Sequence, residues 1–336
     1  MKVLLDCHVP FQLAHGGQQI QIEQTKRALE VVGVEVEYLR WWDDTQRGDV
    51  IHHFGRFAPV QIRLAQEKGI RVVVAELLTA QGSRSRLEIE ARRSFSRTLE
   101  AIMPGAFAER MGWETYRRAD ACVALTGWEA WLMQRMFAAP AERVHVVPNG
   151  VEDVFLHAPP APRGPWLVCT ATITERKRVL ELARAAAAAQ TPVWIVGKPY
   201  AESDPYHRAF VEVARAHPQF VRYEGGIADR ARMAAVYREA RGFVLLSTME
   251  SLSLSALEAA ACECPLLFSD LPWARTVFGD AARYCPVSKS TAVLAAVLRQ
   301  FYDEAPSIPP APKPLSWIAV AEQLRTLYER LARTSR

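Results

Sequence analysis

Runs of Val, Ile and Leu alternate with longer segments of helical periodicity along the whole sequence. Such apolar runs are typical of strands buried on both faces, and helices between them cover the two faces of a parallel sheet. In the first half the predicted strands are Lys2–Cys7, Glu35–Leu39, Asp49–Phe54, Arg71–Leu77, Ala121–Thr126 and Val144–Pro148. In the second half they are Trp166–Ala171, Val193–Lys198, Val221–Gly225, Gly242–Thr248, Pro265–Asp270 and Ala282–Pro286. The pattern predicts an α/β protein with two doubly wound, Rossmann-like sheets.

A Pro-rich tract at 158–165 separates the two sets of strands. Proline lacks a backbone N–H and fixes φ, so this tract is predicted to be a linker. The predicted organisation is an N-terminal domain at 1–157, the linker, a second domain at 166–315, and a helix at 316–336 that crosses back to the N-terminal domain. Two α/β domains joined in this way imply a cleft.

The composition is that of a soluble globular protein, with 50% hydrophobic and 23% charged residues among 336. The net charge of +4 is too small for a dedicated nucleic-acid binder. The six cysteines lack disulfide-framework or zinc spacing, which predicts free thiols and no metal site. No signal peptide and no apolar segment of about 20 residues is visible, which predicts a cytoplasmic protein.

Several common ligand motifs are missing from the sequence. No strand is followed by Gly-x-Gly, and no Gly-x-x-x-x-Gly-Lys loop is present, which argues against nicotinamide enzymes and P-loop NTPases. No Asp-x-Asp pair is present to clamp a metal ion. A bound pyrophosphate would therefore have to be neutralised by Lys, Arg and helix N-termini.

Two carboxylates follow the predicted strand Gly242–Thr248. Residues eight apart differ by about 80° around a helix, so Glu250 is placed in the loop before an Ala- and Leu-rich helix that contains Glu258. From the loop, Glu250 is expected to reach a ligand, and Glu258 is expected to accept hydrogen bonds from vicinal hydroxyls of the same ligand. The backbone N–H groups expected to face an anion are those of Ser251, Leu252, Ser253 and Leu254.

The spacing Glu250-x7-Glu258, followed by Ala-Cys-x-x-Pro, resembles the signature of retaining glycosyltransferases of family four. Further segments resemble motifs of this family in the same order: Gly16-Gly17, Asp49-Val-Ile-His52, Val147-Pro-Asn-Gly-Val151 and Trp194-Ile-Val-Gly197. The resemblance implies the GT-B fold, in which two Rossmann-like domains face each other across a cleft.

The resemblance also implies a reaction. A hexose would move from a UDP- or GDP-linked donor, bound by the second domain, to a glycan, lipid-linked or small-molecule acceptor on the first domain. The anomeric configuration would be retained without metal or cofactor, as in polysaccharide biosynthesis. Glu250 would contact the hydroxyls of the donor sugar and Glu258 the nucleotide ribose.

The donor diphosphate requires cations. Lys177 falls on the diphosphate lysine of the family, and Gly197 ends a strand on the donor side. The second cation of the family falls on Thr172, so Arg176 or Arg178 is expected to replace it.

On the acceptor side, Gly16 and Gly17 are expected to let the backbone approach a substrate. His52 and His53 point to opposite faces of a strand, so one of them is expected in the core. His53 is the candidate catalytic group and His52 a candidate cleft residue.

Residues 81–118 contain eight Arg and five Glu together with Phe95, Met103, Phe107, Met111 and Trp113. Helix packing with a solvated face explains this composition. The alternative is a platform for an acceptor or for peripheral contact with the inner face of a membrane, because basic amphipathic helices attract anionic lipid.

Two other functions remain open for the whole chain. One is a GT-B nucleotide-sugar epimerase. The other is an inactive GT-B binding or scaffold protein, which the departures from the family pattern at Thr172, Leu78 and Glu263 allow.

Overall fold

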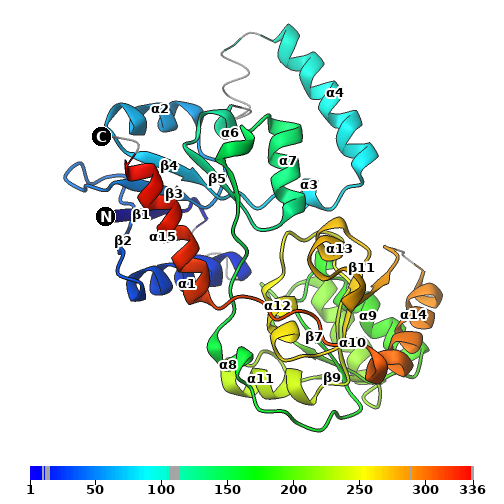
Figure 1. The fold of residues 1–336 in the computed structure, drawn as a ribbon. Helices are drawn as coiled ribbons and strands as arrows, with labels where there is room; N and C mark the ends of the chain where they lie inside the picture. The colour runs from blue at the N-terminus through cyan, green and yellow to red at the C-terminus, as the bar shows by residue number, and fades with distance from the viewer. Residues whose placement is uncertain (10, 12–15, 104, 106–113, 288–289, 334–336) are drawn as a thin grey trace. The chain divides into compact units, whose positions relative to one another are not determined.

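The computed structural model describes the chain except for residues 10, 12–15, 104, 106–113, 288–289 and 334–336 (Figure 1). The described chain divides into two compact units. The first unit contains Met1–Asn149 and the helix that begins at Trp317, and the second contains Gly150–Ser316.

The boundary between the units lies at Asn149–Gly150, ahead of the Pro-rich tract at 158–165 that the sequence predicts as the linker. The difference has a packing reason. Helix α8 (Asp153–Leu156) follows the boundary at once and contains the fully buried Phe155. It packs against α11 (Arg230–Glu239) and α12 (Leu254–Ala261) of the second unit. The N–H of Val151 also donates to the carbonyl of Leu315 at 2.9 Å.

The first unit contains a six-stranded parallel sheet in the order β2-β1-β3-β4-β5-β6. Its strands are β1 (Lys2–Asp6), β2 (Glu35–Tyr38), β3 (Val50–His53), β4 (Arg71–Val74), β5 (Ala121–Ala124) and β6 (Val144–Val146). In the register of β1 and β3, Asp6 lies opposite His53. The last residues of these two strands are therefore direct neighbours.

Helices surround this sheet: α1 (Gly17–Val31), α2 (Pro59–Glu67), α3 (Thr79–Gly82), α4 (Arg86–Ile102), α6 (Thr115–Arg118), α7 (Gly127–Phe137) and α15 (Trp317–Arg333). The C-terminal helix α15 packs against α1, as Figure 1 also shows. The Arg325 guanidinium donates to the carbonyl of Val32 at 2.9 Å. Helix α4 begins with a capping box in which Ser85 and Glu88 satisfy each other's backbone N–H groups.

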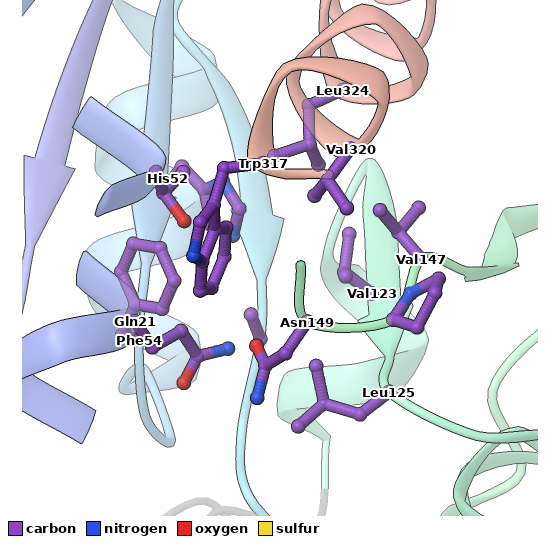
Figure 2. Close-up of a pocket in the computed structure, with 13 residues that line it drawn as sticks. Gln21, His52, Phe54, Val123, Leu125, Val147, Asn149, Trp317, Val320 and Leu324 are labelled. Carbon is purple, nitrogen blue, oxygen red and sulfur yellow. The ribbon is translucent and has the colours of Figure 1, made fainter. Parts of the chain in front are cut away.

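A small pocket of about 20 Å³ lies within the first unit. It is lined by side chains of α1, of α15 and of the ends of four strands, β3 to β6, and Figure 2 shows residues of this lining around a common space. Gln21, His52 and Asn149 supply polar groups, whereas most of the lining is apolar. The indole of Trp317 and the imidazole of His52 lie on the side of α15.

The second unit repeats the architecture with the strand order β12-β11-β10-β7-β8-β9, again all parallel. Its strands are β7 (Leu167–Thr170), β8 (Val193–Val196), β9 (Val221–Tyr223), β10 (Gly242–Leu245), β11 (Leu266–Ser269) and β12 (Ala282–Cys285). Its other helices are α9 (Val179–Ala188), α10 (Pro205–Ala216), α11 (Arg230–Glu239), α12 (Leu254–Ala261), α13 (Pro272–Phe278) and α14 (Thr291–Glu304).

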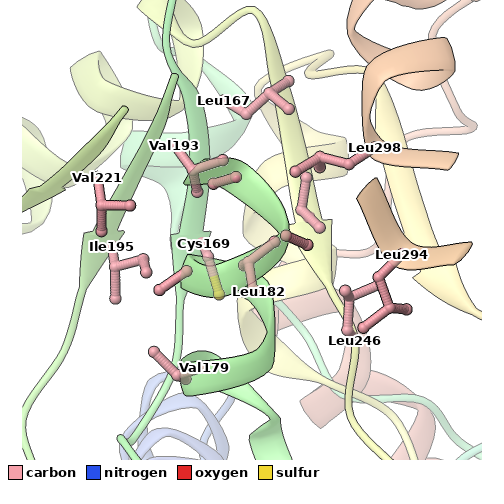
Figure 3. Close-up of a cluster of buried hydrophobic side chains, with 14 of the residues drawn as sticks. Leu167, Cys169, Val179, Leu182, Val193, Ile195, Val221, Leu246, Leu294 and Leu298 are labelled. Atoms are coloured by element: carbon pink, nitrogen blue, oxygen red, sulfur yellow. The ribbon is translucent and has the colours of Figure 1, made fainter. Parts of the chain in front are cut away.

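The core of the second unit joins the central strands to α9 and α14 (Figure 3). Leu167 and Ile195 come from the sheet, Leu182 from α9 and Leu298 from α14, and all four are buried. The small side chains of the Ala-rich α9 let this helix lie close to the sheet, since Ala183, Ala185 and Ala186 are fully buried.

All twelve predicted strands are present, and the prediction of two doubly wound α/β sheets is confirmed. Each strand ends earlier than predicted, because some of the residues that follow, such as Leu246 and Ser247 after β10, are still buried although they no longer belong to the paired strand. Among the described residues, no helix is both long enough and apolar enough to cross a membrane.

Candidate active site

In the second sheet, the order in which successive strands are added reverses between the neighbouring strands β7 and β10. From β7 the chain continues to β8 and β9 on one side, and then returns to β10, β11 and β12 on the other. Open α/β sheets bind ligands beyond the carboxyl ends of their strands at such a switch point. The segments that follow β7 and β10 are therefore the expected place of a ligand.

Three charged side chains from these two segments meet. Glu250 lies in the loop between β10 and α12, and Arg176 and Lys177 lie in the 3-10 turn Glu175–Lys177 after β7. Arg176 Nη1 donates to Glu250 Oε1 at 3.0 Å, and Lys177 Nζ donates to the same oxygen. The side chains of Lys177 and Glu250 are only 12% and 10% exposed, so their ion pair is largely removed from water. The structure thus brings together three of the predicted site residues.

Backbone contacts fix the two loops against each other. The Thr248 N–H donates to the carbonyl of Arg176 at 2.9 Å, and Arg176 Nη1 donates in return to the carbonyl of Met249 at 2.8 Å. The positions of Arg176 and Glu250 are thereby determined by main chain as well as by charge.

Helix α12 begins directly after this loop, with Ser253 as its N-cap. The Ser253 hydroxyl accepts from the Ala256 N–H at 3.4 Å. Ser251, Leu252 and Ser253 are buried, and Leu254 is the first helical residue. The positive end of the helix dipole therefore lies at the loop that carries Glu250, where it favours an anion.

Glu258 belongs to a second polar network, inside the unit and on the side of α11. It accepts from Arg230 Nη2 and from Tyr237 Oη, the latter at 3.2 Å. Arg230 Nε also donates to Glu152 Oε1 at 2.7 Å, and Tyr237 Oη lies 2.6 Å from Thr170 Oγ1 at the end of β7. Burial raises the pKa of Glu258, and the Arg230 charge opposes this shift.

Arg176, and not Arg178, is the second cation beside Glu250. Arg178 has a left-handed backbone (φ 56°) at the N-cap of α9 and is buried. Of the two arginines that the sequence offers as replacements for the family's missing one, Arg176 is the one that pairs with Glu250 in the described part of the chain.

Gly197 follows β8 and packs against the loop after β7. A Cβ at Gly197 would lie 1.8 Å from the carbonyl oxygen of Ala171, so no other residue fits without moving the backbone. Its N–H donates to the carbonyl of Gly225 at 3.0 Å. This close approach gives Gly197 a structural requirement, independent of any contact with a ligand.

Glu263 ends α12 in the left-handed conformation, with φ 58°. Glycine is favoured there, and a glutamate is strained. Its carboxylate compensates with ion pairs to Arg238 at 3.1 Å and Lys313 at 3.4 Å. The departure from the family pattern at this position is therefore accommodated within the second unit.

In the first unit the switch point lies between β1 and β3. His53 ends β3 and is completely buried, with Nδ1 2.6 Å from Asp6 Oδ2 at the end of β1. His52 is also buried, so both histidines lie inside the unit, and His52 lines the pocket described above. It bonds the Tyr328 hydroxyl through Nδ1 and stacks on Phe54. His52 therefore anchors α15 to the sheet.

The predicted glycines lie at the start of α1. Gly16 is the N-cap, with φ 152° and ψ −162°, and Gly17 is the first helical residue. A backbone of this kind at Gly16 strongly favours glycine. The segment at 12–15 that precedes these glycines lies outside the described residues.

The residues around Glu258 were not predicted. Arg230 and Tyr237 come from α11, Glu152 from the loop before α8 and Thr170 from β7, and the packing of α8, α11 and α12 assembles them. Asp6 was likewise not predicted, although its register with His53 follows from the order of the strands.

Both halves of the chain match glycosyltransferase families. Residues 15–150 match the family described as glycosyl transferase 4-like domain, and residues 164–303 match glycosyl transferases group 1. No curated protein matched the sequence.

Solved structures resemble the whole chain. A sucrose-phosphate synthase from Thermosynechococcus elongatus is 17% identical, with a TM-score of 0.67 and 99% of each chain covered. A glycosyltransferase from Rickettsia africae is 10% identical, with a TM-score of 0.65 and 98% of each chain covered. Anabaena Alr3699/HepE, solved in complex with UDP-glucose, is 14% identical, with a TM-score of 0.65 and 99% of each chain covered.

Two parallel Rossmann-like sheets with these relatives define the GT-B fold, so the fold that the resemblance implies is confirmed. The chain is a glycosyltransferase of the GT-B type, with a 4-like domain in its first half and a group 1 domain in its second.

Proposed function

We propose that the chain is a retaining glycosyltransferase that moves a hexose from a UDP- or GDP-sugar to an acceptor held by the first unit. The observation that supports this most is the convergence of Lys177 and Arg176 on Glu250 at the switch point of the second sheet. The two cations suit the diphosphate of a nucleotide sugar, and the carboxylate suits the hydroxyl groups of its sugar.

The binding step follows from this arrangement. Both cations pair with the single carboxylate of Glu250, so the three groups together keep a net charge of +1. An incoming diphosphate offers Lys177 and Arg176 a doubly charged partner, and Glu250 turns to accept hydrogen bonds from hydroxyls of the sugar. Before the donor binds, the ion pairs therefore hold Arg176, Lys177 and Glu250 close to the positions in which they contact the donor.

Transfer breaks the bond between the anomeric carbon and the diphosphate oxygen. Negative charge develops on the leaving diphosphate, and preorganised cations and N–H donors stabilise it in a site from which water is excluded. Lys177, Arg176 and the N-terminus of α12 supply these groups, so the proposed reaction needs no metal ion. Glu258 is assigned to the ribose hydroxyls of the nucleotide, with Arg230 and Tyr237 holding its carboxylate.

A UDP-sugar is the favoured donor, because the similar Anabaena structure was solved with UDP-glucose. The proposed acceptor is a glycan, a lipid-linked sugar or a small molecule, and polysaccharide biosynthesis in the cytoplasm is the proposed setting.

Helix α4 supports peripheral contact with an anionic membrane surface. Leu87, Phe95 and Ile102 are 84%, 66% and 73% exposed, and their spacing places them within about 80° of one another around the helix. Arg86, Arg92 and Arg97 are also exposed on this helix. Apolar side chains with basic neighbours are typical of interfacial helices. Phe107, Met111 and Trp113, which the sequence assigns to the same platform, lie outside the described residues.

Flotation with phosphatidylglycerol vesicles tests this contact. Phe95→Glu is expected to reduce binding, whereas Val31→Glu, at an exposed site on α1, should leave it unchanged. Equal flotation of the two variants and the wild type would refute the role of α4.

A thermal-shift panel of UDP, GDP and their sugar conjugates tests the proposed donor, since a ligand that binds only the folded state raises the unfolding temperature. NMR of the incubated donor then separates the functions. Transfer with retained configuration supports the proposal, and a sugar epimer formed without acceptor supports an epimerase. Absence of binding to both nucleotides supports an inactive scaffold.

A further inference from the structure

We infer that Asp6, His8 and His53 form a binding site for a divalent transition-metal ion of the Zn²⁺ class at the edge of the sheet in the first unit. One ligand atom of each residue lies within 4.8 Å of the others. This site goes beyond the proposed transfer reaction, which uses groups of the second unit and no metal.

The sheet places two of the three ligands. Asp6 and His53 end neighbouring strands and are paired in register, so both project from the carboxyl edge at the switch point of the first sheet. Asp6 Oδ2 lies 2.6 Å from His53 Nδ1, and the two side chains are 4% and 0% exposed. Neither group can move far, and both are already removed from water.

His8 supplies an exposed third ligand in the segment that follows β1. Its Nε2 lies 4.0 Å from Asp6 Oδ2, and its side chain is 57% exposed. The rings of His8 and His53 lie 4.6 Å apart and meet edge to face. Ligands of a tetrahedral Zn²⁺ are separated by about 3.3 Å, as follows from bond lengths of about 2.0–2.1 Å. A small rotation of His8 and a slight opening of the Asp6–His53 contact therefore suffice.

The surroundings of these residues also resemble those of a metal site. Trp41 Nε1 donates to Asp6 Oδ1 at 3.1 Å, which orients the carboxylate and leaves Oδ2 directed at the two imidazoles. His53 Nε2 is buried and has no hydrogen-bond partner among the described residues, so no neighbouring acceptor fixes the proton of this ring on Nε2. Nδ1 is the nitrogen that faces the other ligands.

The donor set selects the kind of ion. Two imidazoles and one carboxylate suit Zn²⁺, Co²⁺ and Ni²⁺ rather than Mg²⁺ or Ca²⁺, which prefer oxygen ligands. Three protein ligands leave a fourth position open for water or for an oxygen of a bound molecule.

The test is titration of the full chain, freed of metal with a chelator and then of the chelator, with Co²⁺. The visible absorption of the bound ion is followed, and Zn²⁺ is then used in competition. We expect saturation at one ion per chain. His8→Gln should weaken binding at least about tenfold, and His157→Gln, a substitution at an exposed histidine of the second unit, should not.

A second pair of variants tests the orientation of Asp6. Trp41→Phe should lower the affinity for the ion by about tenfold, because the hydrogen bond to Asp6 is lost. Trp42→Phe, at an 83% exposed position, should leave the affinity unchanged. Absence of saturable binding at one ion per chain, or equal affinity in wild type and His8→Gln, would overturn the inference. Neither outcome bears on nucleotide binding by the second unit.

Discussion

Lys177 and Glu250 form an ion pair across the carboxyl ends of β7 and β10, with both side chains nearly buried. The residues lie 73 positions apart in sequence, and the sheet order makes them neighbours. A buried pair of this kind contributes little to stability on balance, because desolvation offsets most of the attraction. Its position at the switch point indicates a role in binding.

Glu250→Ala is expected to reduce sugar transfer by about 100-fold or more, because the sugar loses the carboxylate that orients it. The fold should persist at some cost in stability, since Arg176 is 38% exposed to water whereas Lys177 is only 12% exposed and loses its carboxylate partner. The measurement is the transfer rate with the preferred donor, together with the circular dichroism spectrum. Glu175→Ala, an exposed neighbour, is the control. Unaltered turnover in Glu250→Ala would count against the assigned role.

Arg230→Ala is expected to lower the free energy of unfolding of the second unit by about 2–3 kcal/mol. The substitution leaves Glu258 buried with Tyr237 as its remaining donor among the described residues, and loss of one partner of a buried ion pair costs about 3–5 kcal/mol. The value is reduced here because Arg230 is 33% exposed. Denaturant unfolding measures the change.

The matched control for this experiment is Arg232→Ala, on the same helix and exposed. It should change stability by less than about 0.5 kcal/mol. Adding Glu258→Gln to Arg230→Ala should recover part of the loss, because the uncompensated charge is removed. No recovery would show that Arg230 acts through packing on Phe155 instead.

The raised pKa of Glu258 predicts a pH dependence. The folded protein holds a proton that the unfolded chain releases near its usual pKa of about 4.3. The favourable contribution of this group is therefore complete below that pH and is lost as pH rises through the folded pKa. Glu258→Gln removes this loss, so the difference in unfolding free energy between variant and wild type should move in favour of the variant across this interval. A difference that is constant with pH would exclude the shift.

Thiol reactivity is expected to separate Cys7 from the other cysteines. Burial raises the pKa of Cys122, Cys169, Cys262 and Cys264 to about 12 and that of Cys285 to about 11. These groups are protonated at pH 8 and enclosed, so Ellman's reagent should label them only after denaturation. Cys7 is partly exposed. One fast thiol at most is expected in the native protein, and none in Cys7→Ser. Rapid labelling of several thiols would contradict the packing described.

The sequence predicted the strands well because strands buried on both faces are almost wholly apolar, as in Val193–Val196. It did not predict their ends. Leu246 and Ser247 after β10 are as buried as the strand itself, although they no longer pair with β11. Residues within a strand are both buried and paired, whereas residues just past its end can be buried without being paired. A pattern of apolar residues reports burial alone and therefore does not locate the end of a strand.

The same distinction applies to the site. Glu250 and Lys177 follow strands, so local sequence singled them out as candidates, and the structure brings their side chains together. Arg230 and Glu152 acquire a role only through the packing of α8, α11 and α12, for which the sequence carries no local signal. His53 was expected at a surface that binds substrate. Its burial beside Asp6 follows from the register of β1 and β3, a property of the assembled sheet.

Calorimetric titration of wild type and Lys177→Met with UDP tests the donor site most directly. GDP is used instead if it raises the unfolding temperature more than UDP does. The loss of a charged hydrogen bond costs about 1.5–3 kcal/mol, so Lys177→Met should bind about 10- to 100-fold more weakly. Lys313→Met, at an exposed position of the same unit, should bind like wild type. Equal affinity in wild type and Lys177→Met, or failure of the wild type to bind either nucleotide, would contradict the account.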